Sequence, residues 1–246
     1  GILNRLPHGA TWFETSTNDL RAWRAVARAA PAHLTLCDAP VTGGAEGAQA
    51  GTLTMLLGGD ARALDHHREL LGAIAAQTVH MGRCGAGYVA KLCQLHLNYL
   101  AAHGIGEALM LGAKADLDLT ALHRVLMASC AQSYVVDHYI PKVLDGSYDR
   151  SFALGLAARD MRLVSELGAH LRVDLNLADA VCADYARACA AYGADAPHLS
   201  NIRLIEERSR RLLRDDSQQQ QPTQQHEQQH EQQHAQQHAQ QSERDG

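Results

Sequence analysis

The chain has 246 residues, a length that suits one large domain or two smaller ones. Apolar residues make up 46% of it and aromatic residues 4%, which predicts an aliphatic core, and no apolar run approaches the roughly eighteen residues of a membrane span. The 22 basic and 27 acidic residues give a net charge of −5, so neither a nucleic-acid partner nor a membrane partner is indicated.

The six cysteines are scattered and include no CxxC pair, and the first residues lack the charged segment and apolar core of a secretory signal. These features predict free thiols in a reducing compartment, and we expect a cytoplasmic protein.

Residues 1–81 alternate between short β-prone segments and helical ones. The expected strands cover residues 10–14, 34–37, 52–57 and 78–80, and the expected helices run from the cap at 17–19 to about residue 30 and from Asp60 to about residue 76. Alternation of this kind predicts an α/β layer.

After Gly82 the apolar spacing predicts helices only. They are expected at residues 88–114, 119–130, 133–144, 156–167, 176–192 and 200–213. The first is longer than usual for a globular domain and is expected to cross from one domain into the next. We therefore expect an α/β part at 1–81, an all-α domain at 82–213 and a tail at 214–246.

The tail is of low complexity. From Ser217 onward it holds fourteen glutamines and four histidines, with no Leu, Ile, Val or Phe, so we expect it to be disordered. The histidines at 226, 230, 234 and 238 would share one face of a helix, a spacing that could hold a divalent metal. The alternative is a low-complexity expansion without a ligand, and we assign no metal site.

A turn with the sequence Asp-Ala-Pro-Val-Thr-Gly-Gly follows the second expected strand, from Asp38 to Gly44. The hydroxyl of Thr42 and the bare backbone of Gly43 and Gly44 would let N–H groups approach an anion closely. Turns rich in Pro and Gly are also common without any ligand, so both interpretations stay open on the residues alone.

A second glycine-rich turn, from Gly82 to Gly87, runs into the long helix and places Lys91 in its first turn. Only three of the basic residues are lysines, which makes this position informative. A lysine near the N–H groups of a helix start can have a lowered pKa and act as an acid or base. Gln94 and Asn98 lie on the same face, although such a polar stripe also suits a solvated surface.

Together these motifs resemble the β-hydroxyacid dehydrogenase family, which includes 3-hydroxyisobutyrate dehydrogenase, tartronate semialdehyde reductase and 6-phosphogluconate dehydrogenase. That family combines a Ser/Thr doublet after a strand with D-A-P-V-[ST]-G-G, G-x-x-G-x-G-x-x-x-K and F-x-x-x-x-x-x-K-D. The similar segments here are 15–17, 38–44, 82–91, and Phe152 with Arg159 and Asp160. Four motifs in the same order extend the resemblance over about residues 1–205.

The resemblance implies an α/β remnant of a Rossmann-type cofactor domain, followed by an all-α helical domain. It also implies an oxidoreductase that transfers hydride between NAD or NADP and a small 3-hydroxy acid such as 3-hydroxyisobutyrate, glycerate or threonate. In such an enzyme Lys91 would move the hydroxyl proton, and Gln94 with Asn98 would orient the reacting oxygen.

By the same resemblance, Thr42, Gly43 and Gly44 would bind the substrate carboxylate, and Thr17 and Arg159 would touch the cofactor near the nicotinamide. No metal is required. Members of the family assemble through the helical domain, which implies a homodimer or homotetramer.

The chain departs from the family pattern in three ways. It has no G-x-G-x-x-G turn after a first strand, and roughly the first eighty residues of a normal member, which choose between NAD and NADP, are expected to be absent. Leu95 stands where the family has a second amide, and Arg159 stands where it has a lysine. These departures leave an alternative, a catalytically inactive truncated homologue that acts as a helical dimerisation module.

Overall fold

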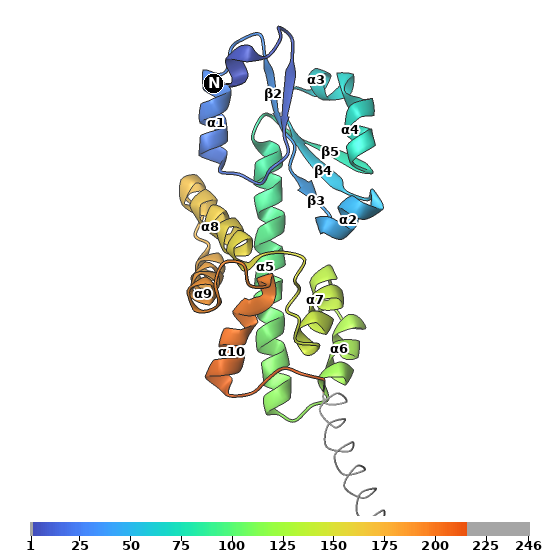
Figure 1. Ribbon diagram of the computed structural model, residues 1–246, viewed down its shortest axis with the longest axis vertical. Helices are drawn as coiled ribbons and strands as arrows, with labels where there is room; N and C mark the ends of the chain where they lie inside the picture. Colours follow the sequence, from blue (N-terminus) through green and yellow to red (C-terminus); the bar gives the residue numbers. More distant parts are fainter. Residues whose placement is uncertain (1, 216–246) are drawn as a thin grey trace, which may run out of the picture. The chain divides into compact units, whose positions relative to one another are not determined.

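The computed structural model describes residues 2–215 (Figure 1). The described residues form two compact units, one of residues 2–103 and 150–201 and the other of residues 104–149 and 202–215. The segment from Ser217 onward, on which the expectation of disorder was based, and its four histidines lie outside the described residues. Arg214, where the expected tail begins, is described and donates hydrogen bonds to Glu206 and to the hydroxyl of Tyr148.

The first unit is built on a five-stranded mixed sheet. Its strands are β1 (Thr11–Glu14), β2 (Thr35–Asp38), β3 (Val41–Thr42), β4 (Thr54–Gly58) and β5 (Gln77–Gly82). Strands β1 and β2 are parallel, as are β4 and β5, while β4 runs antiparallel to β2 and β3. The register pairs Thr42 with Thr54, so the backbone of Thr42 is fixed by β4.

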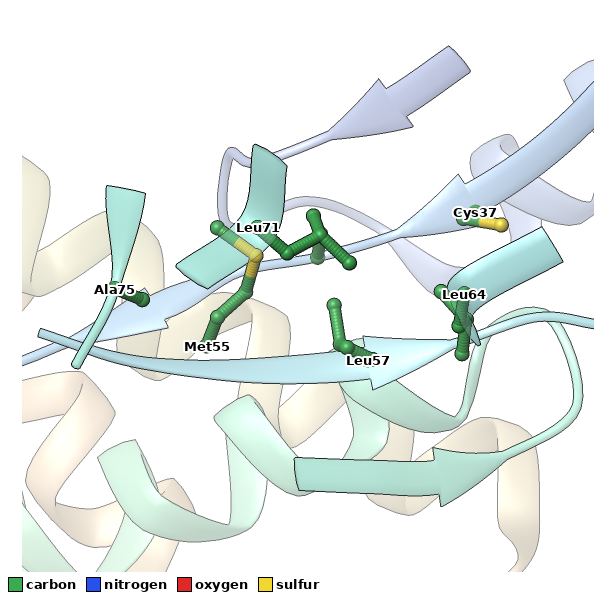
Figure 2. Close-up of a cluster of buried hydrophobic side chains, with 7 residues drawn as sticks. Cys37, Met55, Leu57, Leu64, Leu71 and Ala75 are labelled. Atoms are coloured by element: carbon green, nitrogen blue, oxygen red, sulfur yellow. The ribbon is translucent and has the colours of Figure 1, made fainter. Parts of the chain in front are cut away.

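Four short helices connect these strands: α1 (Leu20–Ala29), α2 (Gly44–Ala50), α3 (Ala61–His66) and α4 (Arg68–Ile74). Figure 1 shows the sheet between α1 on one side and α3 with α4 on the other. Figure 2 shows the core on the α3 and α4 side, where buried apolar side chains of β2, β4 and both helices meet. Because side chains alternate along a strand, Asp38 points away from the face that holds Cys37.

The first unit is completed by the amino-terminal part of α5 (Ala86–Lys114) and by α8 (Leu154–Leu171), α9 (Asn176–Tyr192) and the 3-10 turn η2 (His198–Ser200). Another 3-10 turn, η1 (Ile2–Arg5), precedes β1. The second unit holds the remainder of α5 with α6 (Leu119–Met127), α7 (Tyr134–Leu144) and α10 (Asn201–Ser209), whose first residue lies in the first unit. None of the helices in residues 2–215 combines the length and apolar character that crossing a bilayer requires.

The structure confirms the expected fold class, a Rossmann-type α/β part followed by helices, but two local expectations within the α/β part were wrong. The single helix expected from Asp60 to about residue 76 is divided at His67. The His67 ring meets the Thr11 hydroxyl at 3.0 Å and the edge of Phe13, so it turns toward β1 where the helix breaks. In addition, β3 forms within the segment that was expected to be a turn, and α2 begins at the last residue of that segment, where no helix was expected. The boundaries at residues 82 and 213 stay predictions.

Candidate active site

Asp38, the last residue of β2, caps the helix that carries Lys91. The Asp38 side chain is fully buried, and its carboxylate accepts hydrogen bonds from the backbone N–H groups of Gly85 and Tyr88, the latter at 3.0 Å. The indole N–H of Trp23 donates to the same carboxylate at 3.2 Å. The chain's own carboxylate therefore occupies the position at this helix start where an external anion would bind.

Two glycines, Gly87 at the start of α5 and Gly58 at the end of β4, let α5 pack directly on the sheet. A Cβ atom on Gly87 would lie 2.3 Å from the carbonyl oxygen of Leu56 and 2.8 Å from Oδ2 of Asp38. A Cβ atom on Gly58 would lie 2.4 Å from the same carboxylate oxygen. Close backbone packing thus fixes the start of α5, and Lys91 follows in the second turn rather than in the expected first one.

Lys91 and Thr42 meet at the side chain of Gln94. Lys91 Nζ donates to Gln94 Oε1 at 2.9 Å, and the Thr42 hydroxyl donates to the same oxygen at 3.4 Å. All three side chains are half-buried. The amide oxygen of Gln94 therefore connects the end of β3 with Lys91, the catalytic candidate on α5.

Burial lowers the pKa of Lys91, and the negative charge of Asp160 partly opposes this shift. Burial in turn raises the pKa of Asp160, while a hydrogen bond from Tyr99 and the charges of Lys91 and Arg159 act to lower it. A lysine with a lowered pKa holds a larger neutral fraction near neutral pH, which is the form that can accept a proton.

Gly43 and Gly44 follow Thr42 at the start of α2. Gly43 has a φ of 124°, and a Cβ atom there would approach Cδ2 of Leu53 to 3.1 Å, so the turn requires glycine. Its carbonyl oxygen accepts the first hydrogen bond of α2, from Gly47. The turn therefore exposes a backbone without side chains beside the Thr42 hydroxyl, an arrangement suited to holding a small anion.

Arg159 on α8 contacts the loop that follows β1. Its Nη2 atom donates to the carbonyl oxygen of Thr17 at 2.8 Å, so the two residues expected near the cofactor lie together. This loop leaves the carboxyl end of a parallel strand, the edge where open α/β sheets bind ligands. Hydroxyl and guanidinium donors match the amide and ribose oxygens of a nicotinamide nucleotide, so these residues fit that group.

Two other residues of α5 complete the description of the expected site. Asn98 is half-buried and lies one turn beyond Gln94, and its role stays a prediction. Leu95, which replaces the second amide of the family pattern, is only 6% exposed. Leu95 therefore serves as a core residue of the helix.

Three of the residues that surround this site, Asp38, Asp160 and Tyr99, were assigned no role from the sequence. Asp38 and Asp160 both belong to the motifs that the sequence shows. The signal for Asp38 was an acidic residue at the end of an expected strand, and the signal for Asp160 was an acidic residue next to Arg159. Tyr99 has no such signal, because its hydrogen bond to Asp160 joins residues 61 positions apart.

Comparison with known proteins finds matches over both the sheet part and the helical part of the chain. A family profile described as the NAD binding domain of 6-phosphogluconate dehydrogenase matches residues 1–82, and one described as NAD-binding of NADP-dependent 3-hydroxyisobutyrate dehydrogenase matches residues 85–205. The chain belongs to the β-hydroxyacid dehydrogenase family. The two profiles meet where β5 leads into α5, and the turn from Asp38 to Gly44 and the helix residue Lys91 both fall within matched segments.

Named relatives within the β-hydroxyacid dehydrogenase family are similar over part of their length. An NAD-dependent L-serine dehydrogenase of Pseudomonas aeruginosa is 34% identical over 174 residues, which cover 68% of this chain and 58% of that protein. A 3-hydroxyisobutyrate dehydrogenase of the same organism is 39% identical over 142 residues, which cover 57% of this chain and 48% of that protein. The chain thus spans about half to three fifths of these curated relatives.

The fold of a solved β-hydroxyacid dehydrogenase is similar as well. The structure of 3-hydroxyisobutyrate dehydrogenase from Mycobacterium tuberculosis with L-serine gives a TM-score of 0.75 at 26% identity. The match covers 82% of this chain and 72% of that one.

Proposed function

We propose that this protein is an oxidoreductase that transfers hydride between NAD or NADP and a small 3-hydroxy acid, such as 3-hydroxyisobutyrate, glycerate or threonate. The observation that carries the proposal is the joining of Lys91 to Thr42 through Gln94, with the pKa of Lys91 lowered by burial. Relatives named for L-serine and 3-hydroxyisobutyrate support the substrate class.

The substrate carboxylate would be held by the Thr42 hydroxyl and by the backbone N–H groups of Gly43 and Gly44. No dense cluster of Arg and Lys accompanies these motifs in the sequence, which favours a small carboxylic acid over a phosphorylated sugar acid.

Proton transfer would be the task of Lys91. During oxidation neutral Lys91 accepts the proton of the 3-hydroxyl group as the carbonyl forms, and during reduction Lys91 returns it. Gln94, with Asn98, would orient the reacting oxygen. When bound, a nicotinamide cofactor supplies the acceptor for the hydride, and Thr17 and Arg159 would hold it near its nicotinamide end.

The alternative function is that of a catalytically inactive homologue which acts as a helical dimerisation module. Its support is Leu95, a buried core residue at the position of the family's second amide. Under either function we propose a homodimer or homotetramer. A cytoplasmic location is proposed because the six cysteines, all among the described residues, are unpaired.

Fluorescence titration of the 246-residue chain with NADH and with NADPH separates the two functions. Micromolar binding of either nucleotide, followed by turnover of a 3-hydroxy acid, is the result that the dehydrogenase predicts. Absence of binding up to millimolar nucleotide would contradict catalysis by this chain and favour the dimerisation module.

A further inference from the structure

Tyr99 lies on α5, on the same helix as Lys91 and two turns beyond it. The side chain is 3% exposed, and its hydroxyl donates a hydrogen bond to Oδ2 of Asp160 on α8 at 3.2 Å. Its ring packs against the ring of Tyr185 on α9, with centroids 5.3 Å apart and planes at 71°. The phenol is thus held between three helices of the same unit, with its polar end directed at one carboxylate.

Asp160 is 6% exposed and interacts electrostatically with Lys91. Within the described residues, however, the Asp160 carboxylate and the Lys91 ammonium do not come within the 4.0 Å of an ion pair. Lys91 instead donates to Gln94, and Asp160 accepts from Tyr99. A buried carboxylate beside a half-buried cation gains most by pairing with it, so this separation needs a cause.

We propose that Tyr99 is a positioning residue that holds the Asp160 carboxylate out of contact with Lys91 and so leaves Lys91 able to release its proton. A direct ion pair would stabilise the ammonium and remove the base that oxidation of a hydroxy acid needs. This role of Tyr99 rests on the proposed function, because keeping Lys91 able to release its proton matters only if Lys91 transfers a proton in the reaction.

The other groups around Asp160 do not supply this restraint. Among residues 2–215, the charged or titratable groups that act on Asp160, besides Lys91, are Tyr99 from α5 and Arg159 from α8, and Tyr185 from α9 lies against the Tyr99 ring. The described hydrogen bond of Arg159 goes to the carbonyl oxygen of Thr17. Of the two cations that act on Asp160, Lys91 has the larger effect, so without the Tyr99 hydroxyl Asp160 would pair with Lys91, and that ion pair would raise the pKa of Lys91.

The test is a direct measurement of the pKa of Lys91 in the Tyr99→Phe protein. The chain contains only three lysines, so lysine labelled with 13C at Cε and 15N at Nζ gives few NMR signals. The Lys91 signal is assigned by its loss in Lys91→Arg. We expect Tyr99→Phe to raise the pKa of Lys91 by about one unit, a tenfold change in proton affinity. Tyr185→Phe, which removes a buried hydroxyl one ring away, should leave it unchanged.

Asp160→Asn provides the second arm of the experiment. This change removes the negative charge and should lower the pKa of Lys91, and Tyr99→Phe added to Asp160→Asn should cause no further shift. An unchanged or lowered pKa in Tyr99→Phe, or an equal shift in the Asp160→Asn background, would overturn the proposal. Should Tyr99→Phe fail to fold, an unchanged pKa in Asp160→Asn alone overturns it.

These pKa measurements need no turnover of substrate. The proposed function and the proposed role of Tyr99 can therefore be contradicted independently of each other. The expected pKa shifts in a chain that shows no activity would contradict the proposed function and leave the role of Tyr99 standing. Full activity combined with an unresponsive Lys91 pKa would contradict the role of Tyr99 alone.

Discussion

Oδ2 of Asp38 accepts a hydrogen bond from the backbone N–H of Tyr88 at 3.0 Å, so the last residue of β2 holds the first turn of the helix that carries Lys91. The turn from Asp38 to Gly44 consequently has two tasks. Its first residue fixes the position of α5, and its last three residues form the candidate anion site. The two motifs of the sequence are therefore one structural assembly.

Replacing Asp38 should destabilise the fold. Asp38→Ala leaves the N–H groups of Trp23, Gly85 and Tyr88 without their acceptor, and we expect a loss of about 3 kcal/mol in the free energy of unfolding, since each buried unsatisfied donor costs roughly 1–3 kcal/mol. Asp38→Asn should lose less because it retains an acceptor oxygen. Chemical denaturation followed by tryptophan fluorescence measures both.

The matched control is Asp19→Ala, which removes the cap of α1 at a more exposed position, where the side chain accepts from the N–H of Ala22. A simple cap of this kind is worth about 1 kcal/mol. Equal losses for Asp38→Ala and Asp19→Ala would contradict a special role for the buried carboxylate.

Thr42 should affect substrate binding and not cofactor binding. Thr42→Val preserves the shape of the side chain and removes the hydroxyl, and we expect KM for the hydroxy acid to rise about tenfold, the effect of one hydrogen bond to a charged group. Thr54→Val is the control, because Thr54 pairs with Thr42 in the sheet and forms its own exposed hydrogen bond to Gln77. Steady-state kinetics in which both variants behave alike would argue against the assignment of Thr42.

The rates of the two reaction directions should depend on pH in opposite ways. Burial lowers the pKa of Lys91 below the ordinary lysine value, so the neutral base becomes available at a lower pH than for an exposed lysine. Oxidation should therefore speed up as pH rises through this pKa, and reduction, which needs the ammonium, should slow down. Initial rates measured in both directions across the alkaline range test this, and an oxidation rate that does not change with pH would contradict it.

The long periodic helices and the strand-helix alternation were predictable because each depends on neighbours in the sequence. The break at His67 was not, because the partner of that ring is Thr11, 56 residues earlier. Strand β3 has two residues and exists through its pairing with β4, which no local pattern reports.

The candidate site shows the same difference between features that depend on sequence neighbours and features that depend on distant residues. The residues of the glycine-rich motifs were placed from the sequence, and the structure joins Thr42 to Lys91 through Gln94 as a single cluster. The contact of Tyr99 with Asp160 depends on how α5 packs against α8, so it became visible only in three dimensions.

Proton transfer by Lys91 is the central claim, and kcat of Lys91→Ala and Lys91→Arg tests it most directly in a form of the protein that turns over substrate. We expect Lys91→Ala to lower kcat by roughly 10²–10⁴-fold, the usual contribution of general acid-base catalysis, with KM for the cofactor little changed. Lys91→Arg should be nearly as inactive, because a guanidinium keeps the charge but does not release its proton. If Lys91→Arg retains most of the activity, Lys91 supplies only positive charge and the account of its role is wrong.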